Sequence, residues 1–363
     1  MSKLNDYLKD PFLNDLYTEI RSAGALRSVS IDITSVCNLR CKGCYFFGEG
    51  MDEAKEGNEI DFDAWIENEK LRGTNMVTVV GGEPALQIER LRKLYKNFKI
   101  NVATNGIVRI PKEGLEDLPI GIAIWGNALT DSKLRANGKR NLFKEALGNY
   151  KNDPRAFWYY TVAPGCADQI EEVTETCINN GNRVLFNYYS DLEGKGGEFD
   201  YNKGFSSVMN EIERMIQKYP EYILTTSYLN KVVGSGKLFN ETWGYSTCTN
   251  ISANNPVNAI RVQNGNLYNP HFRAYNADFK TTRRCCTGVD RNCDSCFDTW
   301  EHFSWIMLNM RKHLATKSDF ANWLFVMYTF YSINRLFPVS KENIKLQLVQ
   351  IHSWKESASL ILE

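Results

Sequence analysis

The most informative segment of the chain reads Cys37-Asn38-Leu39-Arg40-Cys41-Lys42-Gly43-Cys44. Three thiols in Cys-x3-Cys-x2-Cys spacing can bind three irons of a cubane cluster and leave the fourth iron without a protein ligand. A structural zinc site, the alternative for closely spaced cysteines, usually has four ligands in paired spacings. We therefore interpret Cys37, Cys41 and Cys44 as ligands of a 4Fe-4S cluster, with zinc binding or inert thiols as the alternative.

The residues around this segment show a repeating pattern. Between about residues 28 and 225, apolar runs rich in β-branched and aromatic residues alternate with amphipathic stretches, which is typical of βα units on a parallel sheet. The amphipathic stretches include residues 61–71, 88–98, 142–150 and 170–179, and Asp61 resembles an N-cap. The expected strands are residues 28–34, 76–80, 100–104, 120–125, 156–162 and 183–189. The pattern predicts an α/β fold.

Unusual residues follow the predicted strands. The cysteine segment follows the first strand, Gly81-Gly82-Glu83-Pro84 the second, Asn105 the third and Trp125 the fourth. Ligands of parallel βα folds bind at the carboxyl ends of the strands, so these residues are expected to share one site. Taken alone, the Gly-Gly-Glu-Pro segment could be an ordinary turn.

With Cys37 to Cys44 followed by Tyr45, and with Gly81-Gly82-Glu83-Pro84, the chain resembles the radical S-adenosylmethionine (SAM) superfamily over roughly residues 25–225. The resemblance implies a partial (βα)6 TIM-type barrel that carries the cluster after its first strand. It also implies SAM as second cofactor, bound to the vacant iron and cleaved reductively to methionine and a 5'-deoxyadenosyl radical. That radical would abstract hydrogen from a substrate carbon.

The resemblance also implies the SAM site. Strand-end carbonyls and Glu83 would receive the SAM ammonium group, because the two glycines let the backbone approach the ligand. Arg135 would contact SAM, although a solvated loop arginine is the alternative. At the position before the third cysteine, where many members of the superfamily have an aromatic residue, this chain has Gly43. The expected cofactor-binding residues are Gly81, Gly82, Glu83, Pro84, Asn105, Trp125, Arg135, Asn187 and Tyr45.

A second group of cysteines lies late in the chain. Cys285, Cys286, Cys293 and Cys296, with Cys248 upstream, supply enough thiols for an auxiliary iron-sulfur cluster or zinc, or they are reduced and packed. The group loosely resembles the cysteine-rich extensions of SPASM and twitch radical SAM enzymes.

One isolated cysteine is a candidate catalytic residue. Cys166 follows the fifth predicted strand and could donate a hydrogen atom to a substrate radical, as in some radical SAM epimerases. An ordinary loop residue beside Pro164 and Gly165 is the alternative.

Composition sets the wider limits. Forty-three basic residues balance forty-three acidic ones, which does not favour nucleic acid or a membrane surface as partner. The start of the chain has no secretory signal, so a cytoplasmic enzyme is expected. The apolar stretch over residues 320–337 is interrupted by polar residues and is expected to be a buried helix.

We expect a barrel over residues 1–225, a cysteine-rich module over 226–299 and a helical extension over 300–363.

The substrate is the least determined feature. The short N-terminus offers no separate domain for a leader peptide, and Asn187 with Tyr188 and Tyr189 suggests a polar small molecule derived from a sugar, nucleoside or amino acid. The layout weakly resembles natural-product tailoring enzymes such as cytosylglucuronate decarboxylases. The alternatives are a SPASM-like peptide maturase and a non-catalytic metal-binding protein. A flavodoxin or ferredoxin is the expected reductant.

Overall fold

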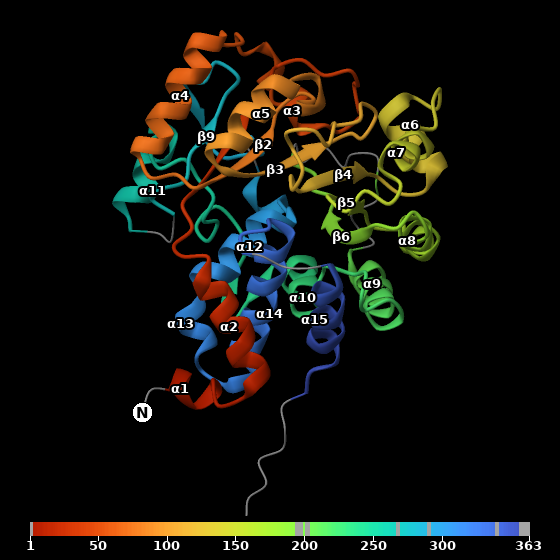
Figure 1. Cartoon of the computed structure of the whole chain (residues 1–363), viewed down its shortest axis with the longest axis vertical. Helices are drawn as coiled ribbons and strands as arrows, with labels where there is room; N and C mark the ends of the chain where they lie inside the picture. Colours follow the sequence, from red (N-terminus) through yellow and green to blue (C-terminus); the bar gives the residue numbers. More distant parts are fainter. Residues whose placement is uncertain are drawn as a thin grey trace, which may run out of the picture.

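The computed structural model describes residues 3–192, 199, 204–265, 269–288, 292–337 and 341–355. Its main sheet has the strand order β10-β9-β1-β2-β3-β4-β5-β6. Strands β1 to β6 are parallel and pair in chain order, so the prediction of an α/β partial barrel is confirmed (Figure 1). These strands are β1 (Ser28–Asp32), β2 (Met76–Val80), β3 (Lys99–Thr104), β4 (Ile120–Ile124), β5 (Ala156–Val162) and β6 (Arg183–Tyr188), each within two residues of its predicted bounds.

Two short strands from the cysteine-rich segment extend this sheet. Strand β9 (Ala274–Tyr275) pairs parallel to β1, and β10 (Thr282–Arg283) pairs antiparallel to β9. Strands β7 (Lys237–Leu238) and β8 (Glu241–Thr242) form a separate pair. Part of the segment predicted as its own module therefore continues the barrel sheet, and the division of the chain into three domains stays a prediction.

Helices cover the sheet and form the end of the chain. Helix α4 (Glu59–Leu71) begins earlier than predicted, because Asn58, not Asp61, is its N-cap and accepts a hydrogen bond of 3.0 Å from the Asp61 backbone N–H. The other helices are α1 (Lys3–Tyr7), α2 (Pro11–Ser22), α3 (Tyr45–Gly48), α5 (Ile88–Asn97), α6 (Ala128–Ala136), α7 (Leu142–Tyr150), α8 (Ile170–Asn179), α9 (Ser206–Lys218), α10 (Ser227–Ser235), α11 (Ala259–Gln263), α12 (Thr299–Leu308), α13 (Met310–His313), α14 (Lys317–Ile333) and α15 (Lys341–Ser353).

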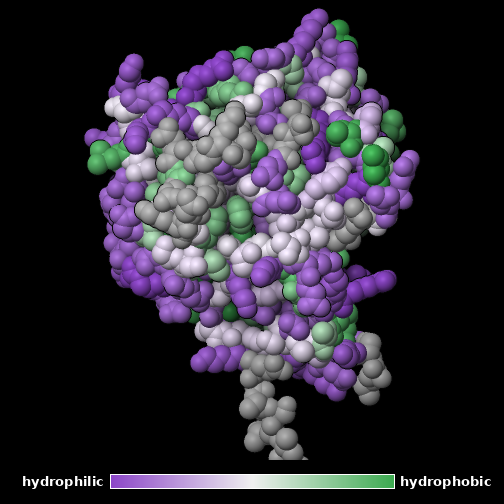
Figure 2. All heavy atoms as spheres, turned by 180° about the vertical axis from the view of Figure 1, so that it is seen from behind, coloured by the Kyte–Doolittle hydropathy of each residue, from purple (hydrophilic) through white to green (hydrophobic). Residues whose placement is uncertain are grey.

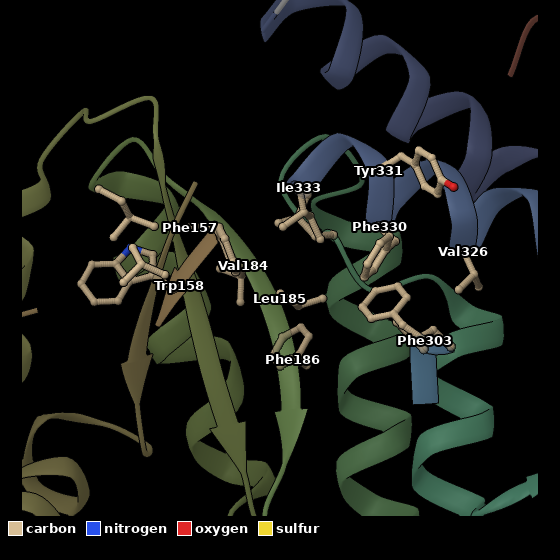
Figure 3. Close-up of a cluster of buried hydrophobic side chains, with 14 of the residues drawn as sticks. Phe157, Trp158, Val184, Leu185, Phe186, Phe303, Val326, Phe330, Tyr331 and Ile333 are labelled. Atoms are coloured by element: carbon tan, nitrogen blue, oxygen red, sulfur yellow. The ribbon is translucent and has the colours of Figure 1, made fainter. Parts of the chain in front are cut away.

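The apolar stretch near the end of the chain forms the buried helix α14, as predicted. Helix α14 packs on α2 and on α12, so these early and late helices lie together below the barrel (Figure 1). Phe303 of α12 and Phe330 of α14 pack with ring centroids 5.4 Å apart, next to Leu185 and Phe186 of β6 (Figure 3). This contact joins the helical end to the barrel core.

The surface is mostly polar. Seen from behind, its coloured part is mainly hydrophilic, with small hydrophobic patches (Figure 2). Across the described part of the chain, no helix combines the length and the apolar character that a membrane span requires.

Candidate active site

The carboxyl ends of the parallel strands open into a cavity of about 490 Å³. The cavity gathers nearly all of the predicted cofactor-binding residues, which come from segments far apart in the sequence. Pro84 instead begins the short 3-10 helix η2 (Pro84–Leu86) beside it. The predicted residues that line the cavity are Cys37, Cys41, Cys44, Tyr45, Gly81, Gly82, Glu83, Asn105, Trp125, Arg135 and Asn187.

The three cysteines lie on the loop between β1 and α3, and each is a half-buried free thiol. Burial raises the pKa of Cys37, and it raises the pKa of Cys41 to about 11 although Arg135 acts in the opposite direction. Thiols with such pKa values are not ionised at neutral pH, so metal binding itself must stabilise the thiolates. Three donors of this kind, on one loop and facing one cavity, fit three irons of a cubane.

Gly43, the departure from the superfamily pattern, has a steric reason here. Its φ is +65°, and a Cβ at this position would lie 2.6 Å from the Tyr189 hydroxyl oxygen. A larger residue would therefore be strained and would also displace Tyr189. Tyr189, which follows the end of β6, therefore lies directly against the cysteine loop at Gly43.

The two glycines of the Gly-Gly-Glu-Pro turn let it approach the cysteine loop. A Cβ on Gly82 would lie 2.1 Å from the Val36 carbonyl oxygen, and one on Gly81 would lie 2.7 Å from that of Thr34. The Gly82 N–H donates to the Thr34 carbonyl at 2.9 Å, and the Glu83 N–H donates to the Val36 carbonyl at 2.8 Å. The close approach is thus made to the loop before Cys37, whereas the sequence suggested an approach to the ligand.

Glu83 lies beneath this turn and is 1% exposed. One of its carboxylate oxygens accepts from the Thr104 hydroxyl at 2.6 Å and from the Ala85 N–H at 2.9 Å, and the other accepts from the Asn105 N–H at 2.8 Å. Burial raises the pKa of Glu83, and these donors oppose the shift. Glu83 therefore joins the end of β2 to the end of β3, while its contact with an ammonium group stays a prediction.

Arg135 lies on the last turn of α6 and is 3% exposed, so it is not a solvated loop residue. Its guanidinium donates to Asp131 at 2.9 Å, to the Ala123 carbonyl at 2.6 Å and to the Asn105 carbonyl at 3.2 Å. It also lies beside the Cys41 thiol. Arg135 therefore places a fixed positive charge at the cysteine loop, where a cluster or a carboxylate would be stabilised by it.

Asn105 and Asn187 connect the cavity wall to other segments. The Asn105 amide donates to the Asn38 side chain on the cysteine loop at 2.7 Å. The Asn187 side-chain amide oxygen accepts from the Thr299 N–H at 2.9 Å, which positions the start of α12. The Trp125 and Tyr189 rings pack edge to face, with centroids 5.8 Å apart. These contacts give the cavity a rigid polar and aromatic wall.

The thiol that faces the cavity from outside the triplet is Cys286, and Cys166 is not among the lining residues. Cys166 lies at the start of the short helix η3 (Ala167–Gln169). Its role as a hydrogen-atom donor stays a prediction.

The second group of cysteines surrounds Glu301, a carboxylate of α12 that is 1% exposed. The Cys286 thiol donates to one carboxylate oxygen of Glu301, and the Cys248 thiol lies 3.9 Å from the other. Burial, with the nearby Asp298 charge, raises the pKa of Glu301 to about 8. Over the described ranges, no group of three or more His, Cys, Asp or Glu side chains, the Cys37–Cys41–Cys44 triplet included, is arranged to hold a single metal ion. The auxiliary site, with Cys285, Cys293 and Cys296, stays a prediction.

Sequence reasoning missed Asp298 and Glu301. Asp298 lines the cavity and caps α12, accepting from the Trp300 N–H at 2.9 Å. Burial raises its pKa to about 6. The available signal was Asp298 with Glu301 three residues later, at the start of an aromatic-rich segment. This pattern indicates the start of a helix and does not indicate a cavity.

Comparison with known proteins agrees with the cysteine triplet. Residues 27–115 match a family model described as a 4Fe-4S single cluster domain. The chain is 26% identical over 215 residues to the sporulation killing factor maturation protein SkfB of Bacillus subtilis (strain 168), covering 52% of this chain and 48% of that protein. It is 30% identical over 91 residues to a probable GTP 3',8-cyclase of Methanococcus aeolicus, covering 23% of this chain and 30% of that protein. The chain thus spans about half, or less, of the curated relatives that it matches.

Solved structures show weaker likeness. Native anSMEcpe with bound AdoMet superposes with a TM-score of 0.49 and 17% identity, covering 74% of this chain and 78% of that one. Streptococcus suis SuiB bound to S-adenosylmethionine gives a TM-score of 0.40 and 17% identity, covering 56% and 52%.

Proposed function

We propose that the chain is a radical SAM enzyme that modifies a peptide substrate, as the matches to the 4Fe-4S domain model and to two curated proteins support. The observation that supports a peptide is the similarity to SkfB, a maturation protein, over 52% of this chain. It favours the peptide maturase, which the sequence offered as an alternative, over a small polar molecule.

The cofactors of the superfamily are a 4Fe-4S cluster and SAM. In our proposal Cys37, Cys41 and Cys44 bind the cluster, and the cavity wall around Gly82 and Asn105 receives SAM. Bound together, the two cofactors supply a one-electron reductive cleavage that generates a strong hydrogen-atom abstractor. The Arg135 guanidinium stabilises the negative charge that collects at the cysteine loop.

The remaining residues of the cavity protect and orient the substrate. Tyr45, Tyr159 and Trp300 line its far side. The Tyr159 and Trp300 rings are 6.1 Å apart, and the Tyr159 hydroxyl donates to Asp298 at 3.4 Å. Aromatic rings exclude water from a reactive carbon, and a buried carboxylate can accept a hydrogen bond from a substrate N–H.

The size of the cavity limits what can enter it. About 490 Å³ lies within the range of small-molecule sites, and SAM itself requires much of that space. We therefore propose that one residue of the peptide enters the cavity while the rest of the chain stays outside. A one-electron donor such as flavodoxin or ferredoxin would reduce the enzyme.

The test is product analysis after anaerobic iron and sulfide reconstitution. With SAM and dithionite, the enzyme is expected to release 5'-deoxyadenosine, and the variant with Cys37, Cys41 and Cys44 changed to Ala is not. Cys177→Ala is the matched control, because this buried thiol of α8 lies outside the cavity. Absence of 5'-deoxyadenosine from the wild type would support a non-catalytic metal-binding protein instead.

Substrate class is tested separately by titration with candidate precursor peptides and with sugar nucleotides. Saturable binding of a peptide, with a mass change after turnover, is expected. Turnover of a sugar nucleotide without any peptide binding would overturn the peptide proposal and leave the superfamily assignment intact.

A further inference from the structure

A second cavity lies at the opposite end of the barrel from the candidate active site. Its volume is about 830 Å³, and it is lined by the first residues of three strands, Lys99 of β3, Ala156 of β5 and Arg183 of β6. The end of α14 and the residues that follow it close the other side, with Ile333 facing the sheet (Figure 3). This cavity has no part in the proposed reaction.

Basic side chains outnumber acidic ones around this cavity. Lys99, Lys112, Arg155, Arg183 and Arg335 line it, against Glu116 and Asp117. Two of the basic groups are already bound to protein partners. Arg155 is held by Asp153 and by three backbone carbonyls, and Arg335 donates to Asp117 at 2.6 Å and to the Pro154 carbonyl at 2.8 Å. Because Arg335 pairs with Asp117, Glu116 is the one carboxylate among the lining residues that is left for Lys99, Lys112 and Arg183. Glu116 is itself exposed.

Arg183 is the unusual group in this cavity. Among the described residues it has no hydrogen-bond or ion-pair partner, and it is half-buried at the start of β6. Burial, together with repulsion by Arg335, lowers the pKa of Arg183 to about 10. A guanidinium without a protein partner at the wall of a cavity can donate to an anion that enters the cavity, and such charge-assisted hydrogen bonds are strong.

The rest of the lining is apolar. Phe157, Leu224, Ile333 and Phe337 form a wall next to the basic groups. A site with a cationic end and an apolar, partly aromatic wall suits a ligand with an anionic head and an apolar body. Guanidinium and ammonium groups together are well suited to a phosphate, which accepts hydrogen bonds in several directions.

We propose that this cavity binds a phosphorylated small molecule, with its phosphate between Arg183 and Lys99 and its apolar body against Phe157 and Phe337. Phe157 also lines the candidate active-site cavity, so the two sites share one side chain of β5. The inference does not depend on the peptide substrate or on the cofactors.

The experiment measures binding of phenyl phosphate, inorganic phosphate and phenol to the reconstituted full chain, by calorimetry and thermal unfolding at constant ionic strength. Phenyl phosphate is expected to bind saturably at one site and to raise Tm. Inorganic phosphate should bind more weakly, and phenol should not bind. Arg183→Met is expected to weaken phenyl phosphate at least tenfold, roughly the loss of one charge-assisted contact.

The controls separate a ligand site from a structural role. Arg214→Met removes an exposed arginine of α9 that pairs with Glu211 and Glu171, and it should leave phenyl phosphate binding unchanged. Without ligand, Arg183→Met should unfold at the same or a higher temperature than the wild type, because it removes an unpaired charge. Arg183→Lys keeps the charge and should retain part of the binding.

Three results would overturn the proposal. Unchanged phenyl phosphate affinity in Arg183→Met would exclude the guanidinium as its partner. A lower Tm of that variant without ligand would assign Arg183 a structural role. Equal affinity for phosphate and phenyl phosphate would exclude the apolar half of the site.

Discussion

The guanidinium of Arg283 holds the carboxylate of Asp32 through two hydrogen bonds of 2.7 and 2.9 Å, although the residues are 251 positions apart. Both are almost fully buried, at 2% and 1% exposure. The same guanidinium donates to the Cys286 carbonyl at 3.1 Å. The pair therefore joins β10 to β1 and positions Cys286 at the candidate active site.

Replacing Arg283 by Met should lower the free energy of unfolding by about 3–5 kcal/mol, because the Asp32 carboxylate would stay buried without its partner. Urea unfolding of the variant and the wild type measures the difference. The double variant with Asp32→Asn as well should recover part of the loss. A loss below about 1 kcal/mol would show that the buried pair is not needed for stability.

Gly82→Ala should separate folding from cluster binding. The new methyl group would lie 2.1 Å from the Val36 carbonyl oxygen, so the loop that carries Cys37 must move. We expect reduced iron content after reconstitution and little change in far-UV circular dichroism. Gly148→Ala in α7 is the matched control, since its Cβ would meet nothing within 4 Å. Wild-type iron content in Gly82→Ala would contradict the proposed role of the turn.

Glu83→Gln should destabilise the junction of β2 and β3. An amide in place of the carboxylate cannot accept from the Thr104 hydroxyl, the Ala85 N–H and the Asn105 N–H together, so a buried donor loses its partner. The expected cost is about 1–3 kcal/mol in chemical unfolding, with weaker SAM binding in equilibrium dialysis. Thr104→Val tests the hydroxyl alone and should cost less. Wild-type stability of Glu83→Gln would argue against the bridging role.

His302 should make stability depend on pH. Burial lowers its pKa to about 4, from an ordinary value of 6.5, and its ring stacks on Trp243 with centroids 4.1 Å apart. Above pH 6.5 the histidine is neutral in both states. As pH falls from 6.5 toward 4, only the unfolded chain gains the proton, so stability falls by up to about 3 kcal/mol.

His302→Phe isolates this contribution, because Phe preserves the stacking and does not titrate. Urea unfolding at pH 5 and pH 7 should show a smaller difference in the variant than in the wild type. Glu301 has its pKa raised to about 8, so its contribution decreases as pH rises and acts in the opposite direction in both proteins. Identical pH dependence of the two proteins would contradict a buried neutral His302.

Iron and sulfide analysis should distinguish the two groups of cysteines. Changing Cys37, Cys41 and Cys44 to Ala should remove the iron of one cluster. Any second iron-sulfur site among Cys248, Cys285, Cys286, Cys293 and Cys296 should remain loaded. We expect residual iron in this variant. Loss of all iron would leave zinc or free thiols at the second group.

Much of the barrel could be predicted because its signals are local. Alternating apolar runs predicted all six parallel strands within two residues, and Cys-x3-Cys-x2-Cys spacing placed three donors on one loop. Strand ends on the same edge then predicted a shared site for the cysteine loop, Glu83 and Asn105. Backbone periodicity and ligand spacing act over a few residues, so they can be read without knowing the path of the chain.

Local patterns could not predict the contacts made between distant segments. The two-residue strand β9 has no detectable periodicity, yet its pairing with β1 brings Cys286 to the cavity. The sequence left a solvated loop position open as the alternative for Arg135, whereas α6 buries it beside Cys41. Nothing near Gly43 in the sequence indicated the Tyr189 hydroxyl. The proposal of a peptide in place of a small substrate rests on similarity to another protein and not on a residue pattern.

The amino-acid sequence was sufficient to establish the parallel strands, the cysteine triplet and the buried helix α14, since each depends on neighbouring residues and their spacing. Tertiary structure alone decided the pairing of Arg283 with Asp32, the surroundings of Glu301 and the unpaired charge of Arg183. These features depend on which groups meet when segments that are separate in the sequence pack together, and burial sets the energetic cost of each charge.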